Sequence, residues 1–308
     1  MRVAGLLLAA VGLAAAADTP PSRSVAVTID DLPAAQSGPE VCAPEALRAL
    51  TGKLLAPIRE RHVPVTAFVI GRNCESLSPA DRRAVLDMWR DAGAELGNHT
   101  YSHRDLNTEP VAEYERDIAR GEESLRNTLG VPHIEWFRFP MLHAGPDPET
   151  KRRVAQFLAD HRWRQAPVTF DNSDWMFAYA FTDPSLAPRV RAEYLPYLES
   201  VIAFFETRSV EVVGREFPQV LLLHANKLNG EMLGSILDML TRRGYRFVSL
   251  PEALRDPAYS QPENYAGKGG FSWIHRWSLT KKMPNKGEPD EPEWLQQAWK
   301  QARAAGAR

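Results

Sequence analysis

Two histidines, His99 and His103, lie four residues apart in a chain of 308 residues. On a helical turn, side chains with this spacing point the same way, so both imidazoles could bind one metal ion. The chain has eight histidines, so the spacing is also compatible with two unrelated surface or capping residues. The pair gains weight as a metal site only if further ligands occur elsewhere in the chain.

Two adjacent carboxylates, Asp30 and Asp31, directly follow a short, mostly apolar and β-branched run at 24–29. The run predicts a buried strand that presents both acids at its carboxyl end. In parallel β/α architectures these strand ends carry the chemistry. The alternative is a helix cap or a turn, where aspartate is common, but a doubled aspartate directly after a buried strand favours a site.

Other polar residues follow later strands in the same way. Arg138 lies between aromatic residues near the end of one strand, Asp171 and Asp174 follow another, and His224 follows the apolar run 220–223. A surface arginine and a core histidine are the alternatives. If the strands are parallel, we expect these side chains to meet at one edge of the sheet.

Strand and helix patterns alternate along the chain, which predicts a parallel sheet or barrel. We expect a break or kink near Pro196, because proline removes a helical hydrogen bond. The predicted strands are 24–29, 63–70, 94–98, 134–140, 163–170, 220–223 and 245–250. The predicted helices are 44–62, 79–91, 111–129, 150–161, 187–213 and 231–243.

Composition narrows the range of functions. The chain is 44% hydrophobic and can fill a large core, and its formal net charge of −2 gives no reason to expect nucleic acid or an anionic membrane as partner. Residues 1–17 combine Arg2 with an apolar run and three alanines, which predicts a cleaved signal peptide. No later stretch reaches the roughly 20 apolar residues of a transmembrane helix. We therefore expect a secreted or periplasmic protein.

Export favours an oxidising compartment, so the only two cysteines, Cys42 and Cys74, are predicted to form a disulfide rather than two buried thiols. From about Arg255 the composition shifts to proline, glycine, lysine and tryptophan. The tryptophans of this tail have two interpretations, aromatic anchors or a sugar-binding or lid surface, and anchoring is favoured. They are Trp273, Trp277, Trp294 and Trp299.

Taken together, five motifs resemble those of the polysaccharide deacetylases, the NodB-homology family of carbohydrate esterases (family 4). The likeness spans about residues 24–255, and the motifs occur in the family's order. The resemblance implies an α/β fold, a distorted (β/α) barrel of the NodB-homology type. It divides the chain into the signal peptide, a catalytic domain at 18–255 and a C-terminal extension at 256–308. The motifs are Thr28-Ile29-Asp30-Asp31, His99-x-x-x-His103, Arg138-Phe139-Pro140, Asp171-x-x-Asp174-Trp175 and Leu222-Leu223-His224.

The resemblance also implies the roles of the site residues. One divalent metal ion, usually Zn²⁺, is held by Asp31, His99 and His103, while Asp30 is the catalytic base and His224 the acid. Arg138 holds Asp30, and Asp174 or its rival Asp171 orients His224. The residues implied to contact substrate are Trp175, Leu222 and Met141, the last standing where the family often has an aromatic residue.

The implied activity is hydrolysis of N-acetyl groups, or O-acetyl groups, on a glycan such as peptidoglycan or a chitin-type oligosaccharide, with release of acetate. Such an enzyme is a hydrolase of carbon–nitrogen bonds other than peptide bonds. Three alternatives stay open: an acetylxylan esterase, a small-amide hydrolase on the same metal site, and a catalytically inactive glycan-binding module. The sequence does not set the oligomeric state.

Overall fold

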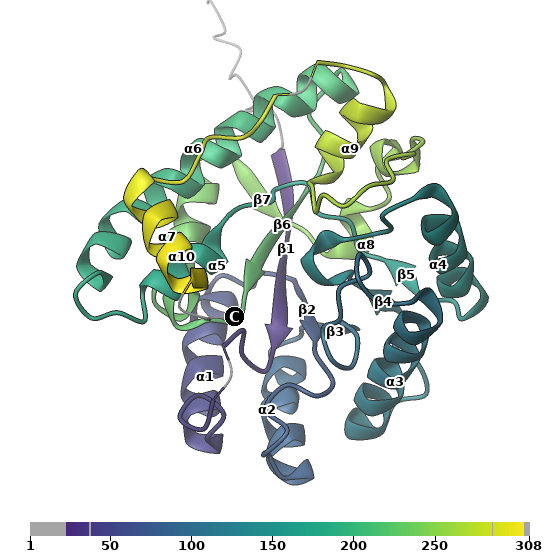
Figure 1. Ribbon diagram of the computed structural model, residues 1–308. Helices are drawn as coiled ribbons and strands as arrows, with labels where there is room; N and C mark the ends of the chain where they lie inside the picture. The colour runs from purple at the N-terminus through teal and green to yellow at the C-terminus, as the bar shows by residue number, and fades with distance from the viewer. Residues whose placement is uncertain (1–22, 37, 285, 305–308) are drawn as a thin grey trace, which may run out of the picture.

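The computed structural model describes residues 23–304 apart from residues 37 and 285 (Figure 1). The predicted signal peptide at 1–17 lies outside the described residues. No helix in the described part of the chain has both the length and the apolar character needed to cross a membrane.

Seven parallel strands form the centre of the molecule, in the order β5-β4-β3-β2-β1-β6, with β7 paired to the start of β1. Figure 1 shows β1 in the middle of the sheet with helices around it. The strands are β1 (Arg23–Leu32), β2 (Val65–Val69), β3 (Glu95–Asn98), β4 (Trp136–Phe137), β5 (Arg164–Gln165), β6 (Gln219–His224) and β7 (Tyr245–Phe247).

The segment that follows β5 connects the two edges of this sheet. Phe170 bridges Leu221 of β6, and Leu222 N donates a hydrogen bond to Phe170 O at 3.1 Å. The sheet therefore curls into a distorted β/α barrel, which confirms the predicted fold class. Of the strand predicted at 163–170, only Arg164–Gln165 form a regular strand, β5. The regular pairing ends there because Pro167 has no N–H to donate, and because the chain leaves β4 and reaches β6 at Phe170.

Helices α2, α3 and α6 have the bounds that the sequence predicts, whereas α5 was not predicted. The break expected near Pro196 is wrong: α6 continues through it, because its neighbours Tyr194, Tyr197 and Leu198 are buried in the core. The helices are α1 (Pro44–Glu60), α2 (Pro79–Asp91), α3 (Val111–Leu129), α4 (Pro148–Asp160), α5 (Asp174–Ala180), α6 (Ala187–Val213), α7 (Lys227–Arg242), α8 (Leu250–Ala253), α9 (Trp273–Thr280) and α10 (Glu293–Ala304).

Strand β1 is buried on both faces. Val25, Val27 and Ile29 belong to the largest core cluster, which also includes buried side chains of α1, α6 and α7. Full burial of one such aliphatic side chain stabilises the fold by about 1.5–3 kcal/mol. The carboxyl end of β1 is thus held by the most strongly packed part of the molecule.

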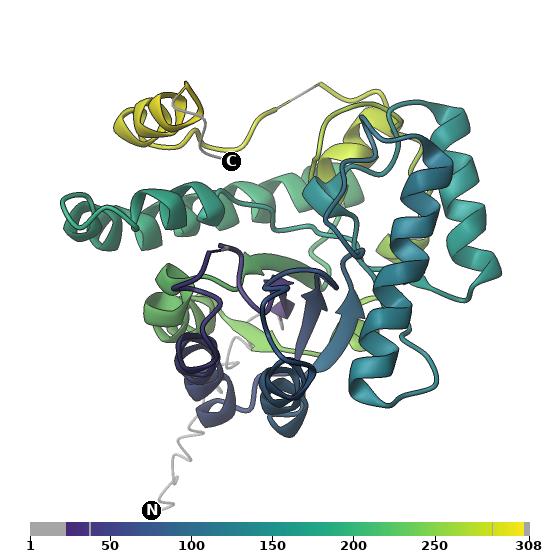
Figure 2. The ribbon, with the colours of Figure 1, turned by 60° about the horizontal axis from the view of Figure 1, so that its bottom comes forward.

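The C-terminal extension packs on the barrel, with α9 against α6 and α10 against α5. Figure 2 shows α10 at the end of an extended connection, on the outer side of α6. Trp273 and Trp277 of α9 are buried in the main core, so they are anchors as expected. The domain boundary at residue 255 stays a prediction.

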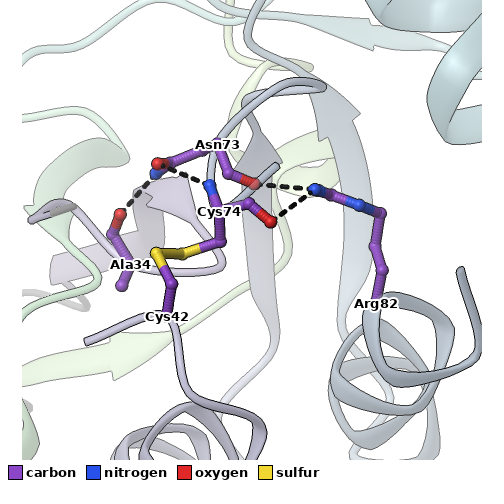
Figure 3. Close-up of a disulfide and its surroundings, with 5 residues drawn as sticks. All are labelled: Ala34, Cys42, Asn73, Cys74 and Arg82. Carbon is purple, nitrogen blue, oxygen red and sulfur yellow. Dashed lines mark hydrogen bonds between the residues drawn. A yellow bond between two sulfur atoms is a disulfide. The ribbon is translucent and has the colours of Figure 1, made fainter. Parts of the chain in front are cut away.

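Cys42 and Cys74 form a disulfide, as expected (Figure 3). Next to it, Asn73 Nδ2 donates to Ala34 O at 2.5 Å, and Arg82 Nη2 donates to the carbonyl oxygen of Cys74 at 3.0 Å. The loop after β1 is therefore tied to the loop after β2 at the carboxyl edge of the sheet.

We expect the double substitution Cys42→Ser with Cys74→Ser to lower the free energy of unfolding by about 3–4 kcal/mol. The bond joins residues separated by 32 positions, and a closed loop of that size restricts the unfolded chain by this amount. Urea unfolding measures the change, with the reduced wild type as control. A loss below about 1 kcal/mol would contradict a stabilising role for this bond.

Candidate active site

Asp31, His99 and His103 come together at the carboxyl edge of the barrel. The Nε2 atoms of the two histidines each lie 3.4 Å from Asp31 Oδ1, and the three ligand atoms lie within 4.8 Å of one another. Asp31 Oδ1 is buried without a hydrogen-bond partner, which is costly for a carboxylate oxygen. One carboxylate and two imidazoles suit a divalent metal ion, and a cation among them would satisfy this oxygen.

Adjacent side chains in a regular strand point to opposite faces, yet both Asp30 and Asp31 line one cavity. The backbone explains this: Asp31 has φ 68°, and the pairing of β1 with β2 shifts register between Ile29 and Leu32. Such an irregularity turns a side chain to the other face. The doubled aspartate therefore supplies two groups to one site.

The expected helical turn at His99 and His103 is wrong. The two residues lie in the loop after β3, where Thr100 has φ 64° and His103 has φ 56°, values that an α-helix does not allow. His103 N donates to Thr100 Oγ1 at 2.9 Å, which closes the turn. The loop, rather than a helix, brings the two rings to a centroid separation of 5.0 Å.

Helix α3 holds this histidine loop in place. Tyr101 N donates to Asp117 O, and Ser102 N donates to Asp117 Oδ2, each at 3.0 Å. Gly121 permits the close approach, because a Cβ there would lie 2.6 Å from the carbonyl carbon of Thr100. The position of the two candidate metal ligands thus depends on a glycine in a neighbouring helix.

We expect Gly121→Ala to weaken zinc binding by about 10- to 100-fold, as the loss of other groups that orient metal ligands does. The added methyl group must push the histidine loop away from α3. The matched control is Gly52→Ala, at a helical glycine with open space around it. Isothermal titration with Zn²⁺ measures both, and equal affinities for the two variants would contradict this account of the loop.

His99 is fixed in the orientation that a metal ligand needs. Its Nδ1 lies 2.9 Å from Arg138 O, so Nδ1 carries the proton and Nε2 is free to bind the ion. Burial lowers the pKa of His103. Burial raises the pKa of Asp31, but the neighbouring imidazoles outweigh it and bring that pKa well below its usual range. Neutral imidazole and ionised carboxylate are the forms that bind a metal.

Asp30 has a different partner from Asp31. Arg138 Nη1 lies 3.3 Å from both carboxylate oxygens of Asp30, and both side chains are buried. Arg138 also donates to Ala166 O at 2.8 Å and to Thr28 Oγ1 at 3.2 Å. Burial lowers the pKa of the Arg138 guanidinium more than the charge of Asp30 raises it, so the net shift is downward. Arg138 is therefore not a surface arginine, and it fixes Asp30 beside the metal ligands.

His224 pairs with Asp174 and not with Asp171. Its Nδ1 lies 2.6 Å from Asp174 Oδ1, while Asp174 Oδ2 accepts from His224 N at 2.9 Å and from Asn229 Nδ2 at 2.6 Å. Burial lowers the pKa of His224, but the charge and hydrogen bond of Asp174 outweigh it and raise that pKa to about 10. His224 is thus an imidazolium at neutral pH, with Nδ1 held by the carboxylate.

Asp171 also lines the cavity but has other neighbours. Burial, and then the charge of Glu288, raise the pKa of Asp171 to about 7. Glu288 comes from the C-terminal extension, where it accepts from His275 Nε2 at 2.7 Å. This cluster was not predictable from the sequence, because no motif connects residues so far apart in the chain.

These groups share a cavity of about 550 Å³. Trp175, Leu222 and Met141 line it as expected. Five other wall residues have a place in the cavity that no sequence pattern indicated; they are Phe139, Leu142, His143, Asn172 and Gly270. Trp299 also lines the cavity, although anchoring was the favoured interpretation of the tail tryptophans.

The loop around Met141 is held by the extension. Met141 and Leu142 have φ values of 51° and 55°, and buried Arg276 donates to Leu142 O and, at 3.1 Å, to Phe271 O. A Cβ at Gly270 would lie 2.0 Å from Met141 O, so only glycine fits there. The extension is thus part of the cavity wall.

We expect Asp174→Asn to leave His224 neutral at pH 8 in metal-free protein, because burial then lowers its pKa without the carboxylate that opposes burial most strongly. In the wild type the ring stays protonated until the pH approaches 10. Imidazole ¹⁵N chemical shifts report the change. Asp171→Asn is the matched control and should leave His224 protonated; a protonated ring in Asp174→Asn would contradict the pairing.

The chain is similar in sequence to known proteins. The family model described as polysaccharide deacetylase matches residues 17–161. Over this part, just under half of its length, the chain is similar to the polysaccharide deacetylase family. It is 24% identical to a peptidoglycan-N-acetylglucosamine deacetylase of Bacillus cereus over 233 residues, which cover 74% of this chain and 66% of that protein.

A chitooligosaccharide deacetylase of Azorhizobium caulinodans is 29% identical over 126 residues, covering 41% of this chain and 51% of that protein. The chain therefore spans two thirds or less of the length of these relatives. Among solved structures, a family 4 carbohydrate esterase pseudoenzyme of Bacillus anthracis, in a mutant with restored activity, superimposes with a TM-score of 0.51 at 21% identity. That match covers 76% of this chain and 68% of the other, and it shows the fold alone.

Proposed function

We propose that this protein is a metal-dependent hydrolase that removes N-acetyl groups from a glycan and releases acetate. One observation carries the proposal: a single cavity contains an Asp/His/His metal site, a carboxylate held by arginine and a histidine held by carboxylate. A disabled member of the family would lack one of these groups. The names of the two deacetylase relatives support a glycan as substrate.

Asp31, His99 and His103 hold the metal ion in this proposal, and their nitrogen and oxygen donors favour Zn²⁺. When bound, the ion lowers the pKa of a water molecule and polarises the carbonyl oxygen of the acetyl group. The rest of the reaction depends on side chains of the chain itself.

Asp30 accepts the proton that the attacking water loses. Arg138 holds its carboxylate in place, and Asp30 Oδ2 lies only 3.7 Å from His99 Nε2, next to the proposed metal ligands. His224 then protonates the nitrogen of the departing amine, because an amine anion is too poor a leaving group to depart alone. The ring can do so because Asp174 holds it as an imidazolium through Nδ1. Acetate and a free amine result.

The acetyl methyl group fits against Leu222, which packs with Leu142 and Val168 in a small apolar cluster. Met141 lines the same cavity, and its backbone N–H is the donor we assign to the developing oxyanion. An N-acetyl substrate is favoured over an O-acetyl ester, because an alkoxide leaves with less need for the protonated histidine that this site maintains.

Export to the periplasm or the exterior is part of the proposal. Its support is the signal-like sequence at 1–17 and the disulfide between Cys42 and Cys74, since disulfides persist in oxidising compartments. An envelope or extracellular glycan is then the accessible substrate.

The direct test measures acetate released from N-acetylglucosamine oligomers, peptidoglycan and acetylxylan, with and without a chelator. We expect acetate from the N-acetylated sugars, its loss with chelator and its recovery with Zn²⁺. Activity that survives the chelator would contradict the metal site. Acetate from no substrate would favour the binding module, and acetate from acetylxylan alone would favour the esterase.

We expect Asp30→Asn and His224→Ala to lower kcat by about 100- to 10,000-fold, the range for loss of a general base or acid. Both variants should still bind Zn²⁺, whereas His103→Ala should lose it, as measured by metal content after dialysis. If Asp30→Asn folded normally but lost the ion, Asp30 would be a ligand and the assigned roles would be wrong.

A further inference from the structure

The cavity has an aromatic wall to which the C-terminal extension contributes. Trp299 of α10 lines the cavity, and its ring packs edge-to-face against Trp175 at a centroid distance of 4.9 Å. It packs in the same way against Tyr179 at 5.2 Å. Trp299 lies far beyond the residues 17–161 that the family model matches, so this wall is not part of that match.

Helix α10 holds Trp299 in a fixed position. Leu295 is fully buried, and Trp294 Nε1 donates to Glu193 Oε2 at 2.7 Å. The guanidinium of Arg189 lies 4.6 Å from the centre of the Trp294 ring. An aromatic side chain on a rigid helix binds a ligand with little loss of conformational entropy.

The wall differs from the anchoring tryptophans of the same extension. Trp273 and Trp277 are buried in the core, whereas Trp175 remains 40% exposed despite its contact with Trp299, which is itself only partly buried. A large exposed aromatic surface at the side of a cavity indicates a binding site rather than packing. Here the anchors and the wall are separate sets of residues.

The position of the wall also fits a substrate contact. Trp175 directly follows Asp174, whose carboxylate holds His224, so one peptide bond joins the aromatic surface to the residue that holds the proposed proton donor. A hexopyranose ring has a polar rim and an apolar C–H face. That face packs on an indole ring, while the rim keeps its contact with water.

We propose that Trp299 and Trp175 form a subsite that binds the sugar ring next to the one that loses its acetyl group. The C-terminal extension then makes the protein prefer an oligosaccharide to a single acetylated sugar. This inference rests on the proposed deacetylase function and extends it to the size of the substrate.

The experiment compares chitin-type oligomers of one to five N-acetylglucosamine units as substrates for the wild type and Trp299→Ala. The wild type should gain at least tenfold in kcat/KM between the monomer and the tetramer. Trp299→Ala should lose most of this gain through KM, and Trp299→Phe should keep most of it. The matched control is Leu279→Ala, at an exposed apolar residue of the extension on α9 that does not line the cavity.

An unchanged preference for length in Trp299→Ala would overturn the subsite. Equal losses on monomer and tetramer, seen in kcat, would overturn it too, since they would show a structural role. If the wild type released acetate from none of these sugars, the proposed function would fail instead. Titration of intrinsic tryptophan fluorescence with the tetramer separates failure of the subsite from failure of the proposed function. It measures the Kd without turnover, and an equal Kd for the wild type and Trp299→Ala would overturn the subsite.

Discussion

The contact between the Arg138 guanidinium and Asp30 is the interaction on which the site depends. A buried arginine costs several kcal/mol unless charge and hydrogen bonds compensate it, and here Asp30, Thr28 and Ala166 do so. The backbone carbonyl of the same residue orients His99. Arg138, directly after β4, thus connects β1, the loop after β3 and the segment after β5. This connection gives the two adjacent acids different surroundings, which supports the different roles proposed for them, base for Asp30 and metal ligand for Asp31.

The pairing of β1 with β6 sets the relative position of Asp30 and His224. Asp30 and His224 are partners in the register of β1 and β6, so the proposed base and the proposed acid lie at neighbouring positions on neighbouring strands. The apolar residues before them are buried on both faces, which makes a slip of one residue very unfavourable. The barrel core therefore sets the position of both proton-transfer groups.

The features that were predicted correctly from the sequence are those that depend on local residue patterns. Apolar periodicity predicted α2, α3 and α6 at their observed bounds, and polar residues after apolar runs identified the strand ends that converge. It could not choose between Asp171 and Asp174, because both follow the same strand and the choice depends on where α5 begins. It also placed the histidine pair on a helix, because positive φ values are not visible in a histidine spacing.

Contacts between distant parts of the chain were the least predictable. Gly121 matters only because a different loop lies against it, and Arg276 and Trp299 matter only because the extension folds back over the cavity. The four tryptophans of the extension looked alike in sequence. Their burial in the structure separates the anchors Trp273 and Trp277 from Trp299 on the cavity wall.

The most direct test of this account is a crystal structure of the protein loaded with Zn²⁺, with anomalous scattering recorded at the zinc edge. We predict one ion bound by Asp31 Oδ1 and the Nε2 atoms of His99 and His103, with Asp30 still paired to Arg138 and not bound to the ion. A zinc ion ligated by Asp30, or anomalous density only away from these residues, would contradict the division of roles between the two aspartates.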